Sequence, residues 1–304
     1  QGNFSDAQIL LEQTYSTIAS NGQHNISLCC DFLAARLSLF QDGGTFVENP
    51  EVKRKELLSL HNMMWLNIFD STYAYYYALT GMPEKIPALF KDHMLSTVSF
   101  LSPCRPMMEM IENQVFLSQK MYAKVIGRSE TLLPVCEKMH YELVSLHVQI
   151  QTAAAYAMLG KHHARQLLQK ALGHAMPDGF LIPFVENYNY IKDVLGSINS
   201  IASEPFTDRI LSLGSVYEQH CLRLSSRNYR PEILNVLNSR EAEIAALITD
   251  RLSNREIAEK LFLSEGTVKQ YVNQIYSKLM INGDTRTKRK QLAELISSIN
   301  KGLT

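Results

Sequence analysis

Residues 252–279 read LSNREIAEKLFLSEGTVKQYVNQIYSKL, and this stretch predicts two short helices joined by a tight turn. Ser253 and Glu256 have the spacing of a capping box, in which both side chains bond to free backbone N–H groups at a helix start. Phe262, with the leucine that follows, turns the chain, and Ser264 can cap a second helix that runs to about the end of the stretch. The sequence therefore predicts a helix-turn-helix unit.

The second predicted helix has two chemically distinct faces. Its apolar stripe recurs at i, i+4, i+7 and i+11 and consists of Val268, Val272, Ile275 and Leu279. Its opposite face carries Lys269, Gln270, Asn273 and Gln274. Lysine can donate to guanine O6 and N7, and glutamine or asparagine can pair with adenine N6 and N7, in a major groove that admits a helix. The pattern predicts that this helix reads double-stranded DNA.

A further helix is predicted before these two. Asn238 and Glu241 form another capping box, and the helix that they open runs to about Asp250. The residues available to a shared core are Ile244, Ala245, Leu247 and Ile248 in this helix and Ile257, Ala258 and Leu261 in the next. The three helices are therefore expected to pack around one small core.

Four segments of this region, taken in order, resemble the LuxR-type (GerE-like) DNA-binding domain. They are LNSRE at 237–241, LSNREIA at 252–258, LSEGTVK at 263–269 and IYSKL at 275–279. The resemblance implies that base edges are faced by Lys269, Gln270 and Asn273. It implies contacts near the phosphate backbone for Ser253, Arg255, Thr267 and Tyr271. It also implies a fourth helix at about 287–299, with a homodimer contact through Leu292, Leu295, Ile296 and Ile299.

The sequence departs from the family pattern at four places. Asn238 replaces the commoner threonine but still caps, and Tyr271 stands where histidine is common, so a phosphate contact there would come from a hydroxyl. Met280 replaces a glycine, and the loop at 282–287 is longer than usual, so the link into the fourth helix differs from that of the family. The basic run 286–290 leaves two interpretations open: additional DNA contacts by Arg286 and Lys288, or a solvated helix start.

The N-terminal two thirds of the chain is dominated by helical periodicity, and alternating strand patterns are nearly absent. The stretches with this periodicity are 5–20, 25–41, 51–80, 84–101, 107–123, 128–145, 146–160 and 162–175. Glycine and proline positions, including Gly81, Gly127 and Gly160, are expected to end helices. Residues 146–172 resemble a tetratricopeptide-type hairpin, with alanines that allow close approach, and Gly81 and Gly127 begin candidate earlier copies.

Residues 175–186 are similar to the segment that closes the helical-repeat region in MalT-like regulators. Physically, Asp178-Gly179 predicts a turn, and Phe180 and Phe184 are expected to fix the last repeat. In large regulators of that kind a nucleotide-binding module precedes the repeats, but the phosphate-loop pattern G-x-x-x-x-G-K-[ST] does not occur here. Such a module either lies upstream of Gln1, in which case this chain is a fragment of a longer protein, or is missing.

Composition supports a two-part, water-soluble protein. Net charge is zero overall, yet residues 225–304 carry 13 basic and 9 acidic side chains, which suggests a polyanionic partner for this part alone. The cysteine count of five is odd and none are spaced C-x-x-C, which favours reduced thiols in the cytoplasm. The longest apolar run is too short to span a membrane.

Aromatic residues crowd one predicted helix and allow two interpretations. Trp65, Tyr73, Tyr76 and Tyr77, with Tyr75, can form a ligand-stacking surface or can pack into the core, and the core is favoured because aromatics at helical spacing usually bury. No nucleophile–base pair or paired-carboxylate spacing is evident, so we expect no enzymatic activity, no cofactor and no metal site.

The sequence thus predicts an all-α protein: a tetratricopeptide-like domain over 1–224, a linker over 225–236 and a four-helix LuxR-type domain over 237–304. The expected function is that of a cytoplasmic transcription regulator, a homodimer on DNA, controlled by a small-molecule effector or a protein partner on the helical domain. Two alternatives stay open: the helical domain is purely a protein-interaction scaffold, or the chain is part of an ATP-switched regulator.

Overall fold

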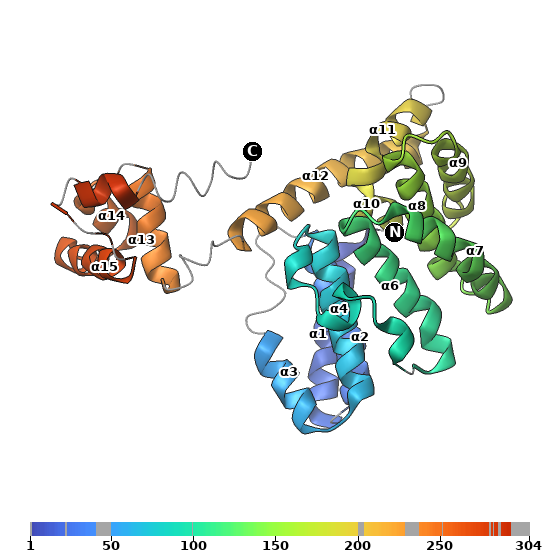
Figure 1. The fold of residues 1–304 in the computed structure, drawn as a ribbon, viewed down its shortest axis with the longest axis horizontal. Coiled ribbons are helices and arrows are strands. Elements are labelled where there is room, and N and C mark those ends of the chain that lie inside the picture. Colours follow the sequence, from blue (N-terminus) through green and yellow to red (C-terminus); the bar gives the residue numbers. More distant parts are fainter. Residues whose placement is uncertain are drawn as a thin grey trace. The chain divides into compact units, whose positions relative to one another are not determined.

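The computed structural model describes residues 2–21, 23–40, 50–98, 100–199, 204–228, 237–250, 252–279, 281, 283–284 and 287–292. Within these ranges the regular secondary structure is entirely helical, so the predicted all-α class is confirmed. The chain divides into two compact units, residues 1–225 and 226–304 (Figure 1). Among the described helices, none is both long and apolar enough to cross a membrane.

The N-terminal unit is built from helices of very different length. They are α1 Phe4–Asn21, α2 His24–Ser38, α3 Pro50–Ser59, α4 Met63–Leu79, η1 Pro83–Lys85, α5 Ala88–Lys91, η2 Leu95–Thr97, η3 Ser102–Cys104, α6 Arg105–Ser118, α7 Tyr122–Lys138, α8 Glu142–Met158, α9 His163–Ala175, α10 Ile182–Glu186, α11 Tyr188–Asn199 and α12 Pro205–Asn228. The η elements are single 3₁₀ turns.

Most of the long helices of this unit pack against the next one along the chain: α1 against α2, α3 against α4, and α6 to α9 in succession. Helix α8 packs against α6, α7, α9 and α11, and it is central to the largest hydrophobic core (Figure 1). Ala153 and Ala154 on α8 and Ala164 and Ala171 on α9 are buried, so these small side chains lie where the two helices approach closely. The hairpin arrangement agrees with the expectation for 146–172, while its tetratricopeptide-like character stays a prediction.

Several predicted helix boundaries in the N-terminal unit are wrong. The stretch 51–80 is two helices, because His61 adopts a left-handed conformation with φ of 53° between α3 and α4. The stretch 84–101 contains only the four-residue α5 and 3₁₀ turns rather than one helix. Gly127 lies inside α7, and the real breaks on either side of this helix are at Lys120 and His140, both with positive φ. A left-handed residue at a helix end is usually a glycine. In this chain histidine or lysine occupies these positions, so a search of the sequence for glycine and proline does not find the helix ends.

The segment after α9 closes part of the core as expected. Gly179 turns the chain with φ of 66°, Phe184 is fully buried and Phe180 packs against the same cluster. Helix α12 continues to Asn228, so the first four residues of the expected linker 225–236 are helical, and residues 229–236 lie outside the described ranges.

The C-terminal unit contains α13 Ser239–Thr249, α14 Asn254–Leu261 and α15 Glu265–Lys278. Its core is formed by side chains from all three helices and from both flanks: Leu237, Ile244, Ala245, Leu247, Ile248, Ile257, Ala258, Val268, Val272, Ile275, Tyr276, Leu279 and Leu292. Leu261 is only partly buried against this cluster. Tyr276 and Leu237 belong to this core although the sequence pattern does not predict it, and Leu292 lies in it rather than at the predicted dimer contact.

Candidate nucleic-acid interface

Helices α13 and α14 each begin with a complete capping box. The Asn238 side chain accepts from the Glu241 N–H at 2.8 Å, and the Glu241 carboxylate accepts from the Asn238 N–H at 2.7 Å. Ser253 and Glu256 make the same reciprocal pair at the start of α14. These local bonds fix where α13 and α14 begin, as their spacing in the sequence predicted.

The turn between α14 and α15 is tight and is centred on Phe262. This residue is left-handed, with φ of 54° and ψ of 43°, and its side chain is 95% exposed. The Leu263 N–H reaches back to the Ala258 carbonyl at 2.9 Å, which closes the end of α14. Ser264 then caps α15 by accepting from the Thr267 N–H at 3.0 Å. The two helices are thereby held with the geometry of a helix-turn-helix.

The two faces of α15 separate as the pattern predicted. Val268, Val272 and Ile275 are buried against α13 and α14. The four residues on the other side, Lys269, Gln270, Asn273 and Gln274, are all exposed. The structure therefore presents one ammonium group and three amides on a continuous outer ridge, hereafter the polar ridge of α15.

The residues expected near phosphates lie around this ridge, but their side chains already make contacts within the unit. Arg255 is on the exposed side of α14 and bonds to Glu259 one turn later at 3.2 Å. The Ser253 hydroxyl donates to the Glu256 carboxylate at 2.7 Å, and Thr267 shares a hydrogen bond of 2.8 Å with Ser264. The ring of Tyr271 packs partly against the core.

Three basic side chains that sequence reasoning did not place bind the helices of this unit to one another. Lys278, in the last turn of α15, donates to the buried Glu241 carboxylate at 2.7 Å. Arg240 donates to the Leu261 carbonyl at 2.8 Å, at the end of α14. Arg289 donates to the Asn254 side chain at 2.9 Å, at the start of α14. Their charge was visible in the sequence, but their partners lie 21 to 37 residues away.

The expected fourth helix is helical over its described part, residues 287–292, and the rest of it lies outside the described residues. Lys288 lies with its ammonium 5.9 Å from the centre of the Tyr276 ring, which is a cation–π distance. Leu292 is fully buried in the core of its own unit, so its side chain is not presented as a surface contact. Arg286, Leu295, Ile296 and Ile299 lie outside the described residues.

The aromatic side chains of α4 are mostly packed rather than open. Tyr73 and Tyr76 are buried, and Trp65 and Tyr77 are partly buried against neighbouring clusters. The Tyr73 and Tyr77 rings lie 5.9 Å apart and pack on each other. This placement corresponds to the core interpretation of these residues. Among the described residues, no group of His, Cys, Asp and Glu side chains is arranged to hold a metal ion.

The fold and the ridge of the C-terminal unit thus define a helix-turn-helix domain. Residues 235–289 match the family described as bacterial regulatory proteins, luxR family. This part of the chain is a LuxR-family helix-turn-helix domain, as the sequence motifs predicted.

Curated relatives match a part of the chain of similar length. The chain is 46% identical over 57 residues to the transcriptional regulatory protein LnrK of Bacillus subtilis, covering 19% of this chain and 26% of that protein. It is 45% identical over 53 residues to the transcriptional regulatory protein DegU of Brevibacillus brevis, covering 17% and 22%. It is 36% identical over 75 residues to the transcriptional regulatory protein DesR of Bacillus subtilis, covering 21% and 38%. The chain thus spans less than two fifths of each of these relatives. No solved structure gave a significant match.

Proposed function

We propose that the protein regulates transcription by binding double-stranded DNA, with α15 in the major groove. The single observation that carries this proposal is the polar ridge of α15, which is exposed while the apolar stripe of the same helix is buried. Lys269, Gln270 and Asn273 supply the donor and acceptor groups that match base edges. The three regulators that share this domain support the assignment.

Phosphate contacts would orient α15 without reading sequence. Arg255 and the N-terminal ends of α14 and α15, near Ser253 and Thr267, lie on the same helix-turn-helix as the ridge. A helix N-terminus attracts phosphate through its free N–H groups and its dipole. Tyr271 and Lys288 are further candidates, as is Arg286. The excess of basic residues in 225–304 favours DNA over other partners for this unit.

The N-terminal unit is proposed to control DNA binding by holding an effector or a protein partner. A scaffold without a small-molecule site and a role within a larger ATP-switched regulator are the alternatives. Binding of DNA as a homodimer, on paired half-sites, is part of the same proposal. We place the protein in the cytoplasm because its target is DNA and because the five cysteines are free.

Selection of DNA from a random duplex pool with the purified full chain tests the proposal. We expect enrichment of a defined site, and a fall in affinity as salt rises, since bound phosphates release counterions. The matched control is a chain with Lys269→Ala and Asn273→Ala, both exposed positions whose replacement leaves the core intact. If the unaltered chain and this variant enrich the same sequences, α15 does not read bases.

A further inference from the structure

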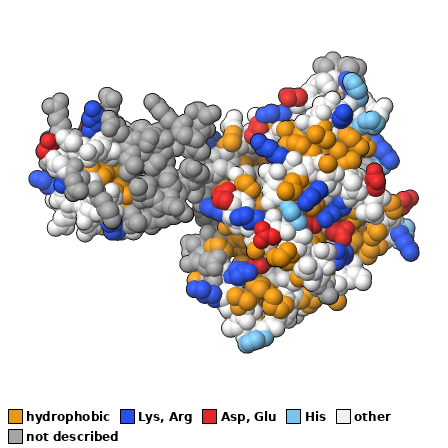
Figure 2. All heavy atoms as spheres, in the orientation of Figure 1, with side chains coloured by type: hydrophobic (Ala, Val, Ile, Leu, Met, Phe, Trp, Pro, Cys, Tyr) orange, Lys and Arg blue, Asp and Glu red, His pale blue; other side chains and the backbone are white. Residues whose placement is uncertain are grey.

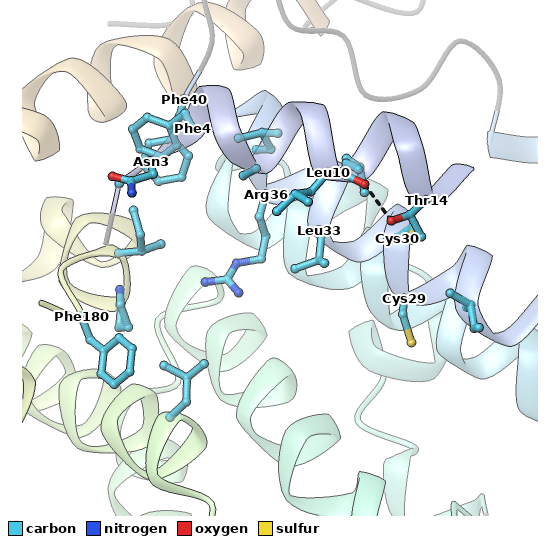
Figure 3. A pocket seen from close by; sticks show the side chains of 18 residues that line it. Asn3, Phe4, Leu10, Thr14, Cys29, Cys30, Leu33, Arg36, Phe40 and Phe180 are labelled. Carbon is cyan, nitrogen blue, oxygen red and sulfur yellow. Dashed lines mark hydrogen bonds between the residues drawn. The ribbon is translucent and has the colours of Figure 1, made fainter. Parts of the chain in front are cut away.

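A cavity of about 850 Å³ opens inside the N-terminal unit, and the DNA-binding proposal makes no use of it. It lies between α1 and α2 on one side and the segment from Phe180 to Pro183 on the other (Figure 3). Its described lining residues all belong to this one unit. A volume of roughly 300–1,000 Å³ is typical of sites that bind small molecules.

The wall of this cavity is strongly apolar and partly open to solvent. Four large apolar side chains that line it remain well exposed: Leu10 at 62%, Leu33 at 54%, Leu143 at 46% and Ile26 at 44%. Exposed apolar patches are also visible elsewhere on the unit, interleaved with charged side chains (Figure 2). Single exposed leucines are ordinary, but several around one cavity mark a binding surface, because a ligand that covers them removes their apolar area from water.

Arg36 is the one charged side chain among the described residues that line the cavity. In Figure 3 its guanidinium extends from α2 into the space between Leu33 and Phe180. Its Nε and Nη2 donate to the Glu186 carboxylate at 2.6 and 3.0 Å, and the Tyr75 hydroxyl donates to the same carboxylate at 2.9 Å. The guanidinium is therefore fixed in position before any ligand arrives.

The ion pair between Arg36 and Glu186 determines which polar group of a ligand suits the cavity. A guanidinium has five N–H donors, and two of them are engaged by Glu186, so donors remain. Glu186 is fully buried and compensates the arginine charge. A ligand carboxylate would bring a second negative charge to a pair that is already neutral, whereas an uncharged carbonyl oxygen needs only a donor. We propose that this cavity binds an uncharged, largely apolar small molecule whose carbonyl oxygen accepts a hydrogen bond from Arg36.

A displacement assay on the full chain tests this inference. The reporter is N-phenyl-1-naphthylamine, an uncharged dye that fluoresces in apolar sites, and the competitors are 2-decanone, decanoate and 1-decene. We expect 2-decanone to displace the dye at concentrations about fivefold lower than 1-decene, the value of one net hydrogen bond, and lower than decanoate. A dye that does not bind, or decanoate as the best competitor, would overturn the proposal.

Two surface positions, one on α1 and one on α2, give a matched pair of variants. Leu33→Trp places a large ring in the cavity, and Ile9→Trp places the same ring on α1 at a position that does not line it. Both residues are more than half exposed, so neither change disturbs the core. We expect Leu33→Trp to weaken dye and ketone binding by about tenfold, equivalent to about 1.4 kcal/mol, and Ile9→Trp to leave both unchanged. Equal effects of the two variants would place the dye elsewhere.

The head-group contact needs its own variant. Arg36→Met combined with Glu186→Gln removes the two charges together and leaves an amide oxygen to accept from Tyr75. This double variant should still bind the dye but lose the preference for 2-decanone over 1-decene. A preserved preference would show that Arg36 does not contact the carbonyl. The inference goes beyond DNA binding, and the assay contains no DNA, so either proposal can fail while the other holds.

Discussion

The carboxylate of Glu241 joins α13 to α15 in the C-terminal unit. It caps α13 through the Asn238 N–H and accepts from the Lys278 ammonium, at the far end of α15, at 2.7 Å. The helix that carries the polar ridge is therefore anchored at the end opposite to the helix-turn-helix turn. One acidic residue, read in the sequence as part of a capping box, also fixes the recognition helix in place.

Loss of this anchor should destabilise the C-terminal unit. Glu241→Gln keeps the side-chain shape but removes the charge, and we expect a loss of about 1–3 kcal/mol in unfolding free energy, the range for a buried polar group that loses its partner. Hydrogen exchange of amides in α13–α15 of the full chain measures it. Glu243→Gln is the control, because Glu243 is 50% exposed in its pair with Arg240, and it should change stability by less than about 0.5 kcal/mol.

The same contact predicts a pH dependence. Burial opposes ionisation of Glu241, but the hydrogen bonds from Lys278 and the Asn238 backbone outweigh it and lower the pKa below the ordinary value of 4.5. Because the folded-state pKa is the lower one, this stabilisation is present above about pH 4.5 and is lost as the pH falls through the folded-state pKa. Exchange protection should therefore fall less between pH 6 and pH 3 in Glu241→Gln than in the unaltered chain, and an identical fall would contradict the assignment.

Base-reading and phosphate-binding residues should respond differently to mutation. Lys269→Ala or Asn273→Ala is expected to cost roughly 1–3 kcal/mol on the selected DNA site and to relax base preference at one position. Ser277→Ala, an exposed change in the last turn of α15, serves as the control. Gel-shift titration on the selected site and on single-base variants measures both. A uniform loss on every sequence would assign Lys269 to the backbone instead.

Arg255→Ala should weaken binding to all duplexes by a similar factor and reduce the slope of affinity against salt by about one. Its ion pair with Glu259 supplies the comparison, since Glu259→Gln frees the guanidinium and removes a nearby negative charge. We expect that variant to bind DNA somewhat more tightly. Titrations at two salt concentrations decide the matter, and an unchanged salt slope in Arg255→Ala would exclude a phosphate contact.

Phe262 has a strained, left-handed backbone in the turn of the helix-turn-helix. Its left-handed backbone disfavours a bulky L-residue by roughly 1–2 kcal/mol, and its 95% exposed ring recovers little by packing. Phe262→Gly should therefore stabilise α14 and α15 by about 1 kcal/mol in hydrogen exchange. Phe262→Ala, which removes the ring but keeps the backbone cost, should have little effect. Equal stabilisation by both variants would mean that the exposed ring, not the backbone, is the source.

In the N-terminal unit the pair of Arg36 and Glu186 should be coupled. Arg36→Met alone leaves a fully buried carboxylate without its cation and is expected to cost about 3–5 kcal/mol. The double variant with Glu186→Gln should be much closer to the unaltered chain. Denaturant unfolding followed by the single tryptophan, Trp65, reports on this unit. If the loss in the double variant equals the sum of the losses in Arg36→Met and Glu186→Gln, the two side chains do not interact.

The sequence alone determined the local architecture of the C-terminal unit. Capping boxes at Asn238 and Ser253, the cap at Ser264 and the spacing of the apolar stripe depend on residues three or four positions apart, so they can be read before folding. The helix boundaries, the turn and the polar ridge of α15 follow from them.

Only the tertiary structure shows the helix ends without glycine, the long-range ion pairs and the cavity. Helix ends at His61, Lys120 and His140 have a left-handed backbone without a glycine, so no local residue pattern marks them. Arg36 meets Glu186 across 150 residues, and Lys278 meets Glu241 across 37. Such ion pairs form only when distant helices come together, since no local rule links residues so far apart. The same holds for the cavity between α1, α2 and the segment from Phe180 to Pro183.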